Sequence, residues 1–223
     1  MNINEFVGML ADLRLPAVFN PYSDTCAVWD LPDAPARRRA NLEAFLNAAL
    51  ETQVSTLWVG RDLGYRGGRR TGIALTDEPN MSKLIEAYGS RLRFHRATKG
   101  PVVAERTASV VWDLIRQMDK PVFTWNVFPL HPHPAGDQMG NRCHTVAERT
   151  LTAPVLRALI DLLKPTRVVA IGNDASVGLR SLGIPCAKVR HPSYGGITDF
   201  RNGIATLHSF KVGNSTRNPQ FSF

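Results

Sequence analysis

The chain has 223 residues, of which 43% are hydrophobic and 21% are charged, a balance that excludes a disordered or fibrous protein. Lys and Arg outnumber Asp and Glu by 27 to 19, so the formal net charge is +8. This excess favours a polyanionic partner such as nucleic acid, although a basic solvated surface is the alternative. We expect a single domain over residues 1–223, because this length can bury one sizeable core.

The N-terminal stretch MNINEFVGMLADLRLPAV has acidic side chains and lacks a basic start followed by a long apolar run. It therefore does not resemble a signal peptide, and no segment approaches the roughly 20 apolar residues of a membrane helix. Cys26, Cys143 and Cys186 lie far apart without CxxC spacing, which favours reduced thiols. We expect a cytoplasmic protein with no membrane partner.

In chain order, helical patterns alternate with short apolar runs that predict strands. The helical patterns cover residues 36–52, 83–89, 108–118, 145–163 and 173–183, and the strands cover residues 56–60, 121–128, 167–172 and 187–190. Each strand is almost continuously apolar, as in a sheet that is buried on both faces. The alternation predicts an α/β fold with a mainly parallel four-stranded sheet flanked by helices on both faces.

One helix boundary has a local cause. Thr145 and Glu148 have the spacing of a capping box, in which each side chain bonds the other residue's backbone amide. The helix should therefore start at about Val146. Residues 129–144 then form a loop at the carboxyl end of the second strand.

Three polar residues lie at or just past the carboxyl ends of predicted strands, namely Asp62, Asn126 and His191. Parallel sheets bind ligands at this edge, where loop amides and helix N-termini converge. We therefore expect the three side chains to share one crevice. Taken alone, His191 is a loop histidine, and such residues are more often at the surface than catalytic.

The stretch GRDLGYRGGRRTGIALTDE (residues 60–78) combines glycines that permit close backbone approach with several arginines. It has neither a GK[ST] sequence nor GxGxxG, so a nucleoside-triphosphate site is not indicated. The stretch could hold a polyanion through Arg66, Arg69 and Arg70 with Asp62 directed at it. The alternative is a tight turn that Asp62 caps.

His131, His133, Cys143 and His144 are residue types that bind zinc, but their spacing fits no common zinc finger. The alternative is a surface loop stiffened by His-Pro repeats. A GxSxG elbow is also absent, so covalent hydrolase chemistry is not indicated.

Taken together, these stretches resemble the uracil-DNA glycosylase superfamily from about Leu57 to about Gly203. The similar segments are GRDLG (60–64), TGIAL (71–75), Asn126 at the end of a central strand, and HPS (191–193). GNRCHTVAE (140–148) with KPTRVVAIGNDA (164–175) is similar to the iron–sulphur branch of the family, without its four cysteines. The five segments occur in the family's order.

The resemblance implies an enzyme that flips a damaged or modified base out of DNA and hydrolyses its N-glycosidic bond without a metal or organic cofactor. Asp62 would orient the attacking water and stabilise positive charge on the sugar. His191 would donate a hydrogen bond to O2 of the departing base, and Asn126 would pair with the pyrimidine edge. Ser193 and Tyr194 would contact DNA, Tyr194 as a wedge, and we expect a monomer.

Gly64 and Leu75 bear on which base enters. By the same resemblance, strict uracil enzymes carry a tyrosine at the position of Gly64, packed against C5 of the base, and a flat aromatic at the position of Leu75. Glycine leaves an opening at C5, so we expect a more permissive pocket that also accepts 5-substituted pyrimidines such as 5-hydroxymethyluracil.

Three hypotheses remain open at this point. The first is a DNA glycosylase that acts on uracil or a related pyrimidine. The second is a DNA-binding protein on the same scaffold that cleaves weakly or not at all. The main reason to consider it is Leu75, which stands in place of the flat aromatic. The third is a metal-dependent hydrolase that uses Asp62 with His131 and His133.

Overall fold

The computed structural model describes residues 1–89 and 92–209, and the main sheet has four parallel strands. The strands are β2 (Thr56–Gly60), β3 (Phe123–Asn126), β5 (Arg167–Ile171) and β6 (Ala187–Val189), in the spatial order β3-β2-β5-β6. The helices of the described chain are α1 (Ile3–Ala11), α2 (Ala34–Glu51), α3 (Gly68–Thr71), α4 (Met81–Tyr88), α5 (Arg106–Ile115), α6 (Val146–Leu163), α7 (Asn173–Ser181) and α8 (Ile197–His208). The predicted fold class is confirmed.

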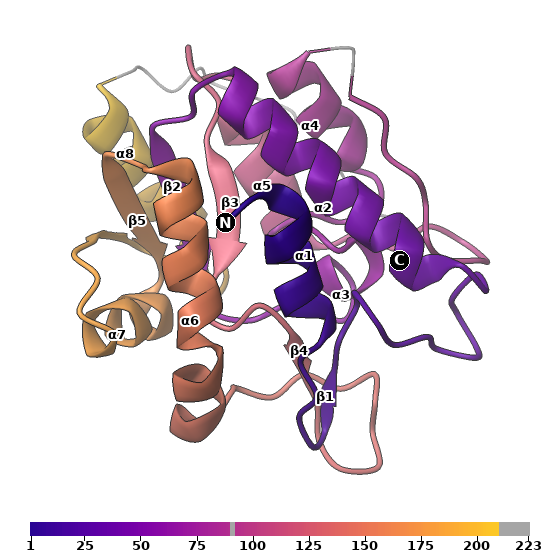
Figure 1. The fold of residues 1–223 in the computed structure, drawn as a ribbon. Coiled ribbons are helices and arrows are strands. Elements are labelled where there is room, and N and C mark those ends of the chain that lie inside the picture. The colour runs from indigo at the N-terminus through magenta and orange to yellow at the C-terminus, as the bar shows by residue number, and fades with distance from the viewer. Residues whose placement is uncertain (90–91, 210–223) are drawn as a thin grey trace.

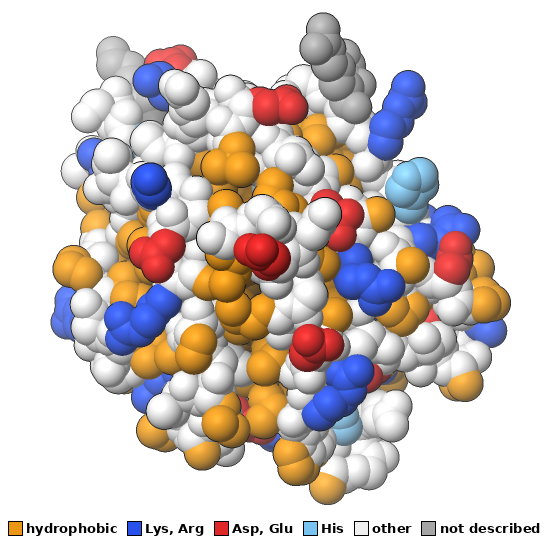
Figure 2. All heavy atoms as spheres, in the orientation of Figure 1, with side chains coloured by type: hydrophobic (Ala, Val, Ile, Leu, Met, Phe, Trp, Pro, Cys, Tyr) orange, Lys and Arg blue, Asp and Glu red, His pale blue; other side chains and the backbone are white. Residues whose placement is uncertain are grey.

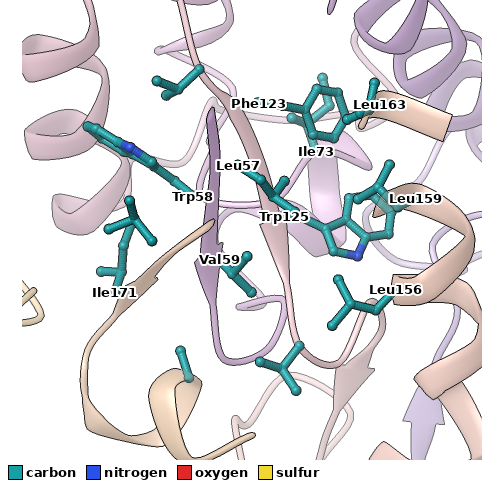
Figure 3. Packing of buried hydrophobic residues seen from close by; sticks show 14 of the residues in the cluster. Leu57, Trp58, Val59, Ile73, Phe123, Trp125, Leu156, Leu159, Leu163 and Ile171 are labelled. Carbon is teal, nitrogen blue, oxygen red and sulfur yellow. The ribbon is translucent and has the colours of Figure 1, made fainter. Parts of the chain in front are cut away.

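Both faces of the sheet are covered. Trp125 on β3 lies opposite Val59 on β2, whereas Trp58, the residue before Val59, faces the other way. Figure 3 shows Trp58 on one side of the strands and Trp125 on the other, beside Leu156 and Leu159 of α6. All of these side chains are buried, which explains why the strand sequences are mostly apolar, whereas Arg167 on β5 and Lys188 on β6 are exposed.

Aromatic contacts attach helices to each face. Phe6 of α1 lies 5.8 Å from Trp125 between ring centroids, and Phe45 of α2 stacks on Phe123 at 4.2 Å. On the opposite face, Phe200 of α8 meets the edge of Trp58 at 6.0 Å. These contacts close the core on both sides of the sheet.

The predicted strand positions agree with the structure, with ends that differ by at most two residues. Helices α1 and α8 were not predicted. The first is only nine residues long, and the second, ITDFRNGIATLH, contains a glycine and β-branched residues that weaken its helical pattern. The short helix α3 within residues 60–78 was also missed.

The predicted start of α6 is confirmed. The Thr145 hydroxyl accepts the Glu148 amide at 3.2 Å, and the Glu148 carboxylate accepts the Thr145 amide at 2.6 Å. The loop at residues 129–144 includes β4 (His131–Pro132), which pairs antiparallel with β1 (Val18–Phe19). Two-residue strands are too short for a periodic signal, so this pair was not predicted.

The strand β3 runs toward the end of the molecule where α3, β1 and β4 lie (Figure 1). The loops that follow β2, β3, β5 and β6 therefore lie at this end, because all four strands are parallel. Within the described ranges, no helix is long and apolar enough to cross a membrane.

Candidate active site

A cleft of about 430 Å³ lies at the carboxyl ends of the strands. Its walls come from the segments that follow β2, β5 and β6, from the start of α5 and from the loop before α6. The sequence-predicted residues that line it are Asp62, Gly64, Leu75, His191, Ser193 and Tyr194. The expected convergence of strand ends therefore holds for Asp62 and His191.

Asp62 is positioned by a backbone pairing that continues beyond the sheet. The Phe128 amide donates to the Arg61 carbonyl at 3.0 Å, and the Leu63 amide donates to the Leu130 carbonyl at 3.2 Å. These bonds hold the segment after β2 beside the segment after β3. The side chain of Asp62 is only 5% exposed there.

Both oxygens of the Asp62 carboxylate have partners. Arg61 Nε donates to Oδ2 at 2.5 Å, and Nδ1 of His144 donates to Oδ1. The His144 ring in turn stacks on Phe128, with 5.4 Å between centroids. The carboxylate is therefore oriented by a cation on one side and by an anchored imidazole on the other.

Arg61 also connects two strand ends. Its second nitrogen, NH1, donates to Asp174 at 2.8 Å, and Asp174 lies in the first turn of α7 after β5. This guanidinium thus joins the Asp62 wall of the cleft to the wall that carries Gly172 and His191.

His191 is held as a neutral hydrogen-bond donor. Its Nδ1 accepts the backbone N–H of Ser193 at 3.1 Å, and the Ser193 hydroxyl lies 2.7 Å from the same nitrogen. Burial, followed by the charge of Arg61, lowers the pKa of His191. Asp174 opposes this shift, and Arg190 adds a smaller lowering effect. At neutral pH the ring proton therefore resides on Nε2.

A glycine allows His191 to approach β5. Gly172 has φ +92°, and a Cβ there would lie 3.1 Å from the Cβ of His191. A side chain at this position would be strained and would press on the imidazole.

Asn126 is 1% exposed, and neither its amide nitrogen nor its amide oxygen has a hydrogen-bond partner among the described residues. A Cβ on Gly60 would lie 2.5 Å from its Oδ1 and 3.0 Å from Leu75. Asn126 is not among the residues that line the cleft, but it lies close to Leu75, which does line it. Unsatisfied buried amides are rare and call for a reason.

Two cleft residues have the left-handed backbone conformation that favours glycine. Leu75 has φ +55° and Tyr194 has φ +50°, a conformation that is strained for bulky side chains. Tyr194 is also 97% exposed. Strain in two neighbouring cleft loops is a feature typical of functional sites.

The structure corrects the prediction that Arg69 and Arg70 face DNA. Arg69 is 3% exposed, its guanidinium lies 3.8 Å from the ring centroid of Phe19, and it bonds His131 at 3.1 Å. Arg70 is 5% exposed and pairs with Glu78 at 3.0 Å. Both arginines hold the fold together.

Arg66, the third predicted arginine, is exposed. Its guanidinium lies 5.4 Å from the ring centroid of Tyr65, and its Nε donates to the Tyr65 hydroxyl at 2.7 Å. It therefore stays a candidate DNA contact.

Among the described residues, His131 and His133 do not form a metal-binding group with Asp62, as the metal-hydrolase hypothesis requires. Both ring nitrogens of His131 are engaged, by Arg69 and by Asn141, each at 3.1 Å. Burial and the Arg69 charge lower the pKa of His131 to about 3. His133 bonds the Pro134 carbonyl at 2.9 Å. Within residues 1–89 and 92–209, no group of three or more His, Cys, Asp or Glu side chains has a metal-binding arrangement.

Sequence reasoning missed two residues of the cleft region. The sequence indicates His144 only as a candidate zinc ligand and as part of the similar segment GNRCHTVAE, and it gives no signal for Glu105, which lines the cleft from the N-cap of α5. His144 lies 82 residues from Asp62, so no local spacing could connect the two. Lys188 and Arg190, both exposed beside Tyr194, were also overlooked.

The chain has the fold of the uracil-DNA glycosylase superfamily. It superposes on the crystal structure of wild-type SMUG2 from Pedobacter heparinus, a member of that superfamily, with a TM-score of 0.63. The alignment covers 93% of this chain and 98% of that chain at 16% sequence identity, a level at which the likeness is one of fold. No family model and no curated protein matches the sequence.

Proposed function

We propose that this protein is a monofunctional DNA glycosylase that hydrolyses the N-glycosidic bond of uracil or a related 5-substituted pyrimidine flipped out of DNA. The observation that carries the proposal is that Asp62 and a neutral, donating His191 line one cleft, with the unpartnered Asn126 close to Leu75 of its wall. The SMUG2 fold supports the same reaction class.

In the proposed reaction, the oxygen of a water molecule forms a bond to C1′ of the sugar. The glycosidic bond breaks, and its electron pair leaves with N1 of the base. Asp62, held by Arg61 and His144, orients the water, takes its proton and offsets the positive charge that develops on the sugar. Charges already in place in a buried site contribute most to such catalysis.

His191 acts on the departing base. Its Nε2–H has no partner among the described residues, so it can donate to the O2 atom, which gains negative charge as the bond breaks. Because the low pKa keeps the ring neutral, the donor does not depend on protonation of the imidazole at neutral pH.

Asn126 recognises the base in this proposal. Its amide nitrogen and oxygen both lack partners, and a pyrimidine edge supplies one acceptor and one donor. Leu75 lines the cleft close to Asn126 and gives the base an apolar surface in this proposal, whereas Gly64 leaves space at C5.

Exposed residues around the opening hold the DNA. Tyr194 serves as the wedge that replaces the flipped nucleotide, because it is almost fully exposed on a strained turn. Ser193 beside it, together with Arg66, Lys188 and Arg190, contacts the phosphates.

One observation favours a second candidate function, a DNA-binding protein that does not cleave. Both oxygens of Asp62 already have partners in the protein, Arg61 and His144. If these bonds persist on DNA and exclude the water, the protein would bind an extruded base without releasing it.

Release of free base from labelled duplexes separates the two candidates. The duplexes should carry a panel that includes uracil and 5-hydroxymethyluracil, with binding to the same DNA measured in parallel. Base release that depends on Asp62 supports the glycosylase. Tight binding without release of any base supports the second candidate.

A further inference from the structure

Glu105 brings a carboxyl group to the cleft beside Gly64. It is the N-cap residue of α5, and its backbone amide donates to Asp77 at 2.5 Å. A Cβ added to Gly64 would lie 3.6 Å from Oε1 and 3.8 Å from Oε2 of Glu105. The carboxyl group is therefore next to the glycine that leaves space for the base.

One oxygen of the Glu105 carboxyl group lacks a hydrogen-bond partner within the described protein. This oxygen, Oε2, is buried against Gly67, where an added Cβ would lie 2.0 Å from it. A buried polar atom without a partner is unfavourable and is rarely retained without a function.

Glu78 provides a comparison, because it is a buried carboxylate that the protein surrounds with hydrogen-bond donors. Its side chain is 3% exposed, and Arg70, Arg96, Thr98 and the Val103 amide all donate to it. Glu105 lacks such a set of donors, which indicates that its partner comes from outside the protein.

The protonation state of Glu105 fits such a role. Burial, and next the charge of Asp77, raise the pKa of Glu105 to about 7, against a smaller opposing effect of Arg66. Near neutral pH the carboxyl group is therefore present in both forms, and in the protonated form it can donate a hydrogen bond.

Three side chains approach the cleft region beside glycines. Asn126 lies at Gly60 and His191 at Gly172, whereas Glu105 lies at Gly64 and more tightly at Gly67. In the proposed function, His191 contacts O2 of the base and Asn126 contacts the edge that carries N3. The edge left for Glu105 carries C5.

We propose that Glu105 is a specificity-determining residue that forms a hydrogen bond with a polar substituent at C5 of the flipped pyrimidine. This inference rests on the proposed glycosylase function and deepens it. The preferred substrate class is then pyrimidines with a hydroxyl-bearing 5-substituent, in preference to those with a methyl group at the same position.

5-Hydroxymethyluracil and thymine form a matched pair, because they differ by one hydroxyl on the same carbon atom. Single-turnover release of each, placed opposite guanine, should be measured for the parent protein, Glu105→Leu, Glu105→Gln and the control Glu51→Gln. Glu51 is exposed at the end of α2, outside the cleft, so its substitution removes one charge without altering the site.

We expect the parent to prefer 5-hydroxymethyluracil and Glu105→Leu to lower that preference by at least about tenfold, because the hydroxyl loses its partner. Glu105→Gln should retain most of the preference and Glu51→Gln all of it. A preference that is the same in Glu105→Leu and in the parent would overturn the inference.

A pH series provides a second test that does not need the leucine variant to fold. The preference of the parent should change with a midpoint near pH 7, whereas that of Glu105→Gln should be flat. Identical pH profiles, or release of uracil alone by the parent, would overturn the inference and leave the proposed function standing. Release of no base at all would overturn both.

Discussion

The two side chains that bond the Asp62 carboxylate differ in chemistry and in their position in the sequence. Arg61 is its chain neighbour and carries a fixed charge, whereas His144 arrives from the loop before α6. The buried carboxylate is therefore preorganised without a ligand. Such preorganisation is what a site needs if it is to stabilise positive charge on a sugar.

We expect Asp62→Asn to lower base release by roughly 100-fold or more, because a neutral amide cannot match the charge of the transition state. Binding to DNA should change little, since the side chain is buried. Single-turnover release and DNA affinity, measured on the same duplex, test the two parts. Release at the parental rate would show that Asp62 does not have this role.

His191→Ala should slow base release by about 10- to 1,000-fold, because the departing base loses the donor at O2. The free energy of unfolding should fall only slightly, since His191 lies in a loop past β6. The rate is measured by single-turnover release and the stability by urea unfolding. A variant with unchanged release contradicts the assignment.

Glu105 should make stability depend on pH. Its pKa is raised in the folded protein, so ionisation there is harder than in the unfolded chain. The cost is absent below the ordinary pKa of a glutamate, grows as the pH rises toward 7 and is complete above it. Glu105→Gln should therefore stabilise the protein by about 1–3 kcal/mol at pH 8 and by little near pH 4.

Urea unfolding of Glu105→Gln at both pH values checks this expectation, with Glu51→Gln as the control. Glu51 is exposed, and its substitution should leave the pH dependence of stability unchanged. Equal stability of Glu105→Gln and the parent at pH 8 would mean that burial does not penalise the Glu105 carboxylate.

At the scale of elements, α6 connects the fold to the site. His144, which bonds Asp62, directly precedes the N-cap Thr145. Arg142 in the same segment pairs with Glu148 through two bonds, at 2.9 and 2.6 Å. The start of α6 therefore fixes the loop that carries the imidazole partner of Asp62.

Thr145→Ala should lower the free energy of unfolding by about 0.5–2 kcal/mol, because the Glu148 amide loses its acceptor. Thr150→Ala is the matched control, since Thr150 is exposed within the same helix and its hydroxyl bonds only the Val146 carbonyl. Urea unfolding of both variants makes the comparison. Equal losses would show that the cap contributes no special stability.

At the scale of the whole molecule, not all of the arginines that give the chain its positive net charge lie at the surface. Arg38, Arg69 and Arg70 are buried, and Arg38 pairs with Asp30 at 2.5 Å. On the face shown in Figure 2, Lys and Arg side chains are interspersed with Asp and Glu. In the proposed function, attraction for DNA depends on the exposed cations near the cleft, Arg66, Lys188 and Arg190.

We expect DNA affinity to fall steeply with salt concentration, because phosphate contacts release counterions. Arg190→Ala should make the slope of log affinity against log salt shallower by about one. Arg116→Ala is the control, since Arg116 is exposed at the opposite end of α5 from Glu105. Affinities measured at several salt concentrations test both variants, and a slope near zero in the parent would contradict the DNA interface.

The sequence by itself determined the four strands of the main sheet, the start of α6 and the edge of the sheet where the site lies. Buried strands such as β2 must be apolar on both faces, so TLWVG could be recognised locally. The start of α6 followed from two residues three positions apart. Parallel strands then carry Asp62 and His191 to one edge, whatever the details of packing.

Only the tertiary structure decided which polar side chains act together. The arginines of YRGGRR look alike in sequence, yet Arg69 and Arg70 are buried and Arg66 is exposed. His144 and Glu105 reach the Asp62 region from distant segments. Burial and pairing of this kind depend on contacts between residues far apart in the chain, and the hydrophobic periodicity of a local stretch carries no information about them.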